Sequence, residues 1–181
     1  MLQESAIGWL YGLVGKAAPD EGWADDEHIR YGLYQECLAG CSEDTSDDTE
    51  EAIVGIVVQD PDRTMAEATL VWHVDRLAPA YGPAEAFAAR VRVIAVLAPG
   101  FDFLQTRIEH WQLVKRAETD PEGSLAGILA GTHWLQRTIV ETSDSPLLLT
   151  ALAEHGGSRR VRNTAADRLR RASSGVRRNP G

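Results

Sequence analysis

Apolar residues recur every three or four positions through most of this sequence, and Gly, Pro and acidic residues interrupt the pattern at short intervals. This spacing places apolar side chains on one face of an α-helix. The interruptions mark helix ends, since Gly and Pro stop helices and acidic residues favour helix starts. The chain is therefore expected to be all-α, with about eight or nine helices in antiparallel hairpins. A single domain is predicted over residues 1–172, followed by an Arg-containing tail, residues 173–181.

The most regular pattern lies in residues 145–171. Ser145 and Pro146 suit the first positions of a helix. Gly156 and Gly157 suit its end, because Gly adopts the left-handed backbone conformation at little cost. In the second helix that follows, three residues recur every four positions: Val161, Ala165 and Leu169. This segment is predicted to form a helical hairpin.

The sequence VRNTAADRL at residues 161–169 resembles the second helix of a HEAT-type repeat, whose core reads V-R-x-x-A-A-x-x-L. The resemblance covers residues 145–171. It implies right-handed stacking of helical hairpins and a binding role, and it implies no catalytic residues. Residues 49–78 repeat the pattern only in part, because Ala66 stands in place of the Arg and Thr69 in place of the first Ala. Whether the hairpins form a repeat array therefore stays open, and the alternative is a generic terminal hairpin.

Residues 52–58, AIVGIVV, fit either a strand or a short buried helix. Their β-branched side chains favour a strand. The helical surroundings favour a helix, because a lone strand has no other strand to pair with. We predict a helix, preceded by an acidic loop over residues 42–51.

Charge is unevenly distributed along the chain, whose net charge is −9. Residues 1–65 hold 15 acidic and 3 basic residues, whereas residues 158–181 hold eight Arg and one Asp. Such polarity suggests a charged partner or head-to-tail association of the chain, although two solvated ends would give the same distribution. The candidate partner-binding residues form two acidic clusters: Asp25, Asp26, Glu27, Asp47, Asp48, Glu50 and Glu51.

Three His–Trp neighbours and a series of Gly residues suggest an alternative site, a pocket between helices. The Gly residues lie in a long helix predicted over residues 120–141, where close packing of a neighbouring helix is the competing interpretation. The candidate pocket residues are Trp72, His73, His110, Trp111, Gly127, Gly131, His133 and Trp134. No metal or cofactor is predicted, because the His–Trp pairs lack carboxylates at metal-site spacing. Cys37 and Cys41 are only two potential ligands and are predicted to be small buried residues.

No Gly-rich phosphate loop, G-x-S-x-G or H-E-x-x-H motif occurs. The leading expectation is therefore a non-catalytic protein-binding module, such as a small acidic inhibitor or immunity-type protein that covers a basic partner. The alternatives are an enzyme or small-molecule binder that uses the His/Trp pocket, and nucleic-acid binding through the Arg-rich C-terminus, which lacks aromatic residues for base stacking. A cytoplasmic location without a membrane partner is expected, since neither a spanning apolar run nor a signal peptide is recognisable.

Overall fold

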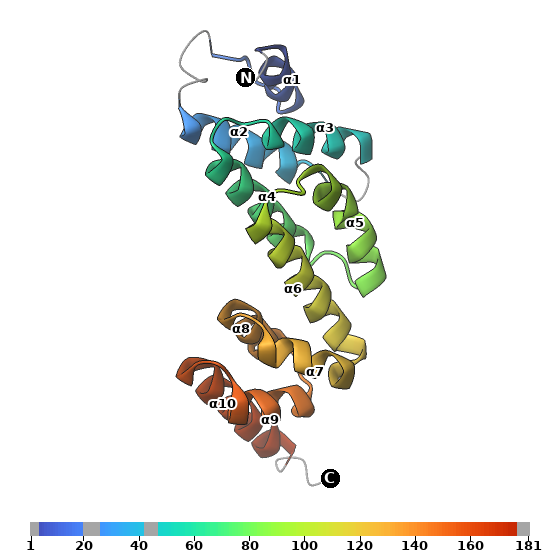
Figure 1. The fold of residues 1–181 in the computed structure, drawn as a ribbon, viewed down its shortest axis with the longest axis vertical. Coiled ribbons are helices and arrows are strands. Elements are labelled where there is room, and N and C mark those ends of the chain that lie inside the picture. The colour runs from blue at the N-terminus through green and yellow to red at the C-terminus, as the bar shows by residue number, and fades with distance from the viewer. Residues whose placement is uncertain (1–3, 20–25, 42–46, 177–181) are drawn as a thin grey trace. The chain divides into compact units, whose positions relative to one another are not determined.

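The computed structural model describes residues 4–19, 26–41 and 47–176. These residues form ten α-helices and no strand, which confirms the all-α prediction (Figure 1). The helices are α1 (Glu4–Leu13), α2 (Glu27–Ala39), α3 (Asp47–Val58), α4 (Arg63–Leu77), α5 (Ala84–Leu97), α6 (Asp102–Thr119), α7 (Pro121–Ala130), α8 (His133–Thr142), α9 (Pro146–His155) and α10 (Arg159–Val176). The predicted count is slightly low because residues 120–141 form two helices, which meet at Gly131 and Thr132.

The chain divides into two compact units, residues 1–108 and residues 109–181. Helix α6 begins in the first unit and ends in the second. The single domain predicted over residues 1–172 stays a prediction. Helix α10 extends to Val176, into the segment predicted as a tail, and residues 177–181 lie outside the described residues.

In the first unit, α2 and α3 run antiparallel, so that Asp60, just after the end of α3, lies beside Arg30 in the first turns of α2 (Figure 1). The helix predicted over residues 52–58 is confirmed. It begins earlier than predicted, since residues 47–51 are helical and not a loop. Acidic residues in a first helical turn interact favourably with the helix dipole, which explains why this acidic segment is compatible with a helix.

The apolar spacing in residues 64–77 and 84–98 predicts which faces of α4 and α5 are buried. All eight residues on these predicted faces are buried: Ala66, Leu70, Val74, Leu77, Phe87, Val91, Ile94 and Ala98. In residues 2–17 the helical spacing predicts one apolar stripe, formed by Leu2, Ala6, Trp9, Leu10, Leu13 and Ala17. Of these residues Leu10 is buried in α1, whereas Trp9 and Leu13 are 40% and 43% exposed, and Ile7 and Tyr11 are buried in their place.

In the second unit, residues 145–171 form the predicted hairpin, with α9 and α10 packed against each other (Figure 1). The Ser145 hydroxyl accepts a hydrogen bond from the Leu148 N–H, and the Ser158 hydroxyl accepts one from the Val161 N–H at 3.2 Å. Val161 and Ala165 are buried, and Leu169 is half-buried against the same core. Local capping and the four-residue apolar spacing thus determined this hairpin.

The glycines between α9 and α10 are needed for a reason that differs from the prediction. Gly156 has a φ of −56°, so the turn does not use the left-handed conformation there. A Cβ atom at this position would lie 2.5 Å from the Leu152 carbonyl oxygen and 2.7 Å from Cγ1 of Val161. Gly156 therefore permits a close approach of the two helices.

Replacing Gly156 by Ala should destabilise the protein by about 1–3 kcal/mol, because the added methyl group overpacks the hairpin. The matched control is Gly32→Ala, in the interior of α2, where a Cβ atom meets nothing within 4 Å. This control should stabilise by about 0.5–1 kcal/mol, since Ala has the higher helix propensity. Urea denaturation of both variants measures the difference, and an unchanged midpoint for Gly156→Ala would contradict the close-packing explanation.

Candidate partner-binding groove

The candidate acidic residues do not form one surface. The Asp26 carboxylate caps α2, accepting hydrogen bonds from the N–H groups of His28 and Ile29 at 2.9 and 3.3 Å. Because α2 and α3 are antiparallel, Asp26 and Glu27 lie at one end of the pair and the acidic start of α3 lies at the other. A helix of this length spans about 18 Å, so the two clusters are well separated.

The exposed members of the two clusters are Glu27, Asp48 and Glu51. Asp25 and the side chain of Asp47 lie outside the described residues. Glu50, in contrast, is completely buried. This corrects the sequence expectation for Glu50, whose carboxylate is inside the first unit and does not face a partner.

Glu50 joins three helices of the first unit. Its Oε1 atom lies 2.5 Å from Nε2 of His73 on α4, and its Oε2 atom forms an ion pair with Arg90 on α5. Arg90 is held on its other side by Tyr81, whose hydroxyl accepts a hydrogen bond from Nε at 2.9 Å. Charges buried in this way need partners, so the cluster fixes the relative positions of α3, α4 and α5.

His73 is neutral in this cluster. Its Nδ1 atom lies 3.4 Å from a guanidinium nitrogen of Arg76, which can only donate, so Nδ1 accepts and Nε2–H donates to Glu50. Burial and, to a smaller extent, the charge of Arg76 together lower the pKa of His73 to about 3. The histidine predicted to line a pocket is thus part of the core.

This cluster predicts a pH dependence of stability. In the unfolded chain His73 binds a proton below its ordinary pKa of 6.5, whereas in the folded chain it stays neutral down to about pH 3. Its contribution is therefore fully present above pH 6.5 and falls as the pH decreases towards 3, by up to about 1.4 kcal/mol per pH unit. The groups that face it are Glu50 from α3, Arg76 from α4 and, across Glu50, Arg90 from α5.

The measurement is urea denaturation between about pH 7 and pH 5, above the range in which most carboxylates titrate. The His73→Gln variant should lose stability at pH 7 and should depend less on pH than the wild type. His28→Gln is the matched control, because the side chain of His28 is 89% exposed. If His73→Gln keeps the full pH dependence of the wild type, the dependence comes from other groups.

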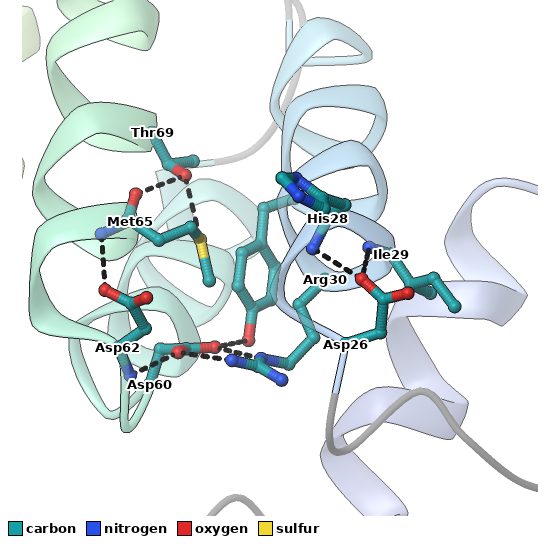
Figure 2. A network of polar contacts seen from close by, with 9 residues as sticks. Asp26, His28, Ile29, Arg30, Asp60, Asp62, Met65 and Thr69 are labelled. Carbon is teal, nitrogen blue, oxygen red and sulfur yellow. Dashed lines mark hydrogen bonds and ion pairs between the residues drawn. The ribbon is translucent and has the colours of Figure 1, made fainter.

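A second buried network ties α2 to the connection between α3 and α4, as Figure 2 shows. The Asp60 carboxylate accepts hydrogen bonds from Arg30 at 2.8 and 3.2 Å, from the Tyr34 hydroxyl at 2.8 Å and from the Asp62 N–H at 2.8 Å. The hydrogen bond with Asp60 raises the pKa of Arg30, and burial raises the pKa of Tyr34. Both oxygens of the buried Asp60 carboxylate accept hydrogen bonds from groups of the same fold, which gives this network a structural role.

The candidate His–Trp residues belong to both units: Trp72 and His73 to the first, and His110, Trp111, His133 and Trp134 to the second. In the second unit Trp134 contacts His110 in a stacked arrangement at 5.9 Å and Trp111 edge-on at 5.4 Å. His133 is exposed, and its Nε2–H donates to the Gly157 carbonyl at 3.1 Å. In the first unit, both ring nitrogens of His73 are engaged as described above, and the ring of the adjacent Trp72 lies 5.8 Å below the Arg76 guanidinium.

The glycines of the predicted long helix do not form a continuous stripe. Gly131 ends α7, so it leaves the helical register of Gly127. A Cβ atom at Gly127 would lie 3.0 Å from a methyl group of Leu113 on α6. This contact agrees with the packing interpretation at Gly127.

The cysteines are packed in the core of the first unit. The Cys37 thiol lies 3.4 Å from the Leu10 carbonyl oxygen, and burial raises its pKa to about 11. Burial also raises the pKa of Cys41. Within the described ranges, no three His, Cys, Asp or Glu side chains come together in a group that could hold a metal ion.

An open cleft of about 680 Å³ lies along α5 in the first unit, and the sequence did not indicate it. Glu51 of α3 and Tyr81 of the α4–α5 connection form part of its wall, and the α5 residues Arg90 and Arg92 line it as well. Its apolar floor comes from five residues of α5: Ala86, Ala89, Val93, Val96 and Leu97. We call this cleft the α5 groove.

Helix α5 is apolar on two opposite faces. Its inner face packs Phe87, Val91 and Ile94 into the core, where all three are fully buried. The groove floor lies on the outer face, where Val96 is 69% exposed. Only three residues of AEAFAARVRVIAVL are polar, namely Glu85, Arg90 and Arg92. A helix that is apolar on nearly all sides is normally buried on all sides. Exposure of the apolar outer face of α5 to solvent is therefore unusual.

The second unit has an apolar groove of about 520 Å³ between α7 and α9. Leu125, Leu129 and Leu147 contribute most of its apolar side chains. Leu125 and Leu129 are half-buried and also pack on the core of their own unit, whereas Leu147 is 41% exposed.

Comparison with known proteins gives no relative: no family model matches the chain, and neither a characterised protein nor a solved structure shows significant similarity to it. Among the described residues, no helix has the length and apolarity needed to cross a membrane.

Proposed function

We propose that this chain is a non-catalytic protein-binding module and that the α5 groove is where its partner binds. The observation that carries the proposal is the outer face of α5, which exposes an apolar strip while the opposite face of the same helix is buried. Exposed apolar patches of this kind mark interaction sites on soluble proteins. The resemblance of residues 145–171 to a HEAT-type hairpin is consistent with a binding role.

The rigidity of the groove supports the same proposal. Arg90, which lines the groove, is fixed by Glu50 and Tyr81, and Glu50 is fixed in turn by His73. A lining side chain that is held by a buried polar cluster from three helices is already in place before a partner arrives. Preorganisation of this kind reduces the entropy lost on binding.

The test uses the full chain as bait for proteins from its source cells, followed by binding measurements with the purified partner. Val96→Asp places a charge on the most exposed apolar side chain of the strip and should weaken binding at least about tenfold, because the charge would be buried at the interface. Leu147→Asp is the matched control, since Leu147 is another exposed apolar residue, in the second unit. Leu147→Asp should leave the affinity unchanged.

Circular dichroism should show the same helix content for both variants and the wild type, because both substituted side chains face solvent. A partner that binds wild type and Val96→Asp with equal affinity would overturn the proposal.

A further inference from the structure

The chemistry of the α5 groove also indicates what binds there, on the assumption that the proposed function is correct. The groove lies along α5 beside α3, and its floor is helical. Helices satisfy their own backbone hydrogen bonds, so the floor offers no edge to which an extended peptide could add as a strand. A partner helix needs no such edge, because its backbone groups are satisfied internally.

The border of the groove is acidic. Glu51 lines it directly, Asp48 lies one turn earlier on α3 and is exposed, and Glu85 is exposed immediately before Ala86 at the start of α5. The positive charge that faces solvent near these three carboxylates is the guanidinium of Arg92, which is exposed. The charge of Arg90, the other Arg that lines the groove, is balanced by buried Glu50. The first unit as a whole holds 19 acidic and 7 basic residues, a net charge of −12.

We infer that the α5 groove binds an amphipathic α-helix of a partner protein, with its apolar face on Ala89, Val93 and Val96 and basic side chains directed at Glu51 and Asp48. The apolar face supplies most of the affinity, since buried apolar contacts dominate helix-in-groove complexes. The basic side chains select the partner and accelerate its association. A second copy of this acidic chain is the less suitable occupant, because it would bring like charges to the border.

The experiment uses fluorescence anisotropy with three synthetic peptides of about 18 residues, long enough to form a helix. All carry the same leucine face, and the remaining positions hold lysine, glutamine or glutamate. The lysine peptide should bind at least about tenfold more tightly than the glutamate peptide at about 0.1 M salt, and this preference should shrink towards 1 M salt as the Debye length decreases.

Variants of the full chain test separately where the peptide binds and whether acidic residues at the border of the groove contribute to its affinity. Val96→Asp should abolish binding of the lysine peptide. Glu51→Gln should weaken it roughly two- to fivefold, as expected for one exposed ion pair. Glu27→Gln is the matched control, since it removes the same charge from an exposed position at the other end of the α2–α3 pair, and it should have no effect.

Each contrary outcome has a distinct meaning. If the peptides bind equally well but binding still requires Val96, the inference about a basic helix is overturned while the proposed function stands. If binding of the lysine peptide is unaffected by Val96→Asp, or if no peptide binds, the inference fails, and the proposed function then rests on the natural partner alone. Sedimentation of the chain without peptide measures its oligomeric state and so tests whether a second copy of the chain occupies the groove. A dimer that dissociates in the Val96→Asp variant would also overturn the inference.

Discussion

Replacing Asp60 by Ala should destabilise the protein by about 3–5 kcal/mol, the range found when one partner of a buried ion pair is removed. The Asp60 side chain is completely buried and serves three groups, namely Arg30, the Tyr34 hydroxyl and the Asp62 N–H. Without the carboxylate, the Arg30 guanidinium stays in the core as an uncompensated charge. Urea denaturation followed by circular dichroism measures the loss.

Two further variants separate the ion pair from the turn that contains it. The Asp62 carboxylate caps α4 by accepting a hydrogen bond from the Met65 N–H at 2.9 Å. Asp62→Ala removes only this cap and should lower the free energy of unfolding by about 1 kcal/mol. The double variant Asp60→Ala with Arg30→Met should recover much of the loss, because the unpaired charge is gone. Equal destabilisation by Asp60→Ala and Asp62→Ala would contradict the role given to the ion pair.

Replacing Val161 by Asp should have a comparably large effect on the second unit, with a loss of about 3–5 kcal/mol. Val161 is 3% exposed and packs with α9 next to Gly156, where no room exists for water around a carboxylate. An ionised group buried without a partner is among the most destabilising single changes. The expected result is a large decrease in the midpoint of thermal or urea unfolding.

The control for Val161→Asp is Asn163→Asp, which places the same carboxylate on an exposed position of the same helix. It should change the free energy of unfolding by less than about 0.5 kcal/mol. Leu169→Asp should lie between the two, since Leu169 is only half-buried. If Val161→Asp unfolds at the same midpoint as Asn163→Asp, the hairpin does not pack as described.

Much of the fold was predictable from the sequence because its determinants are local. Capping residues and apolar spacing define the α9–α10 hairpin, and the same spacing identified the buried faces of α4 and α5. The break at Gly131 was missed because Ala and Leu on both sides continue the helical pattern. Thr132, a residue type that favours helix starts, was the available signal for a second helix. Its hydroxyl caps α8 by accepting a hydrogen bond from the Leu135 N–H at 3.3 Å.

The buried charges could not be assigned without the tertiary structure. Arg30 and Asp60 are 30 residues apart, and Glu50 and His73 are 23 apart, so only packing of the helices brings them together. The sequence did contain a signal for Glu50, which lies on the same buried helix face as Ile53, Val54 and Val57 once the predicted helix is extended back to Asp47. Treating residues 42–51 as a loop concealed that signal.

The α5 groove was also hidden from sequence reasoning. The apolar residues of α5 predict that the helix is buried. Periodicity alone cannot distinguish an apolar face that packs within the same chain from an apolar face that is exposed and binds a partner. Only the positions of α3, α4 and α6 show which apolar residues of α5 are covered and which line a cleft.

Methyl NMR with labelled Val and Leu residues tests most directly whether the α5 groove is a binding surface. The lysine peptide is titrated into the full chain, and every methyl resonance is followed. We expect the signals of Val93, Val96 and Leu97 to shift with a common saturation curve, while those of Leu125, Leu129 and Leu147 stay in place. Shifts confined to the second unit, or spread evenly over both units, would contradict the assignment of the binding surface to α5.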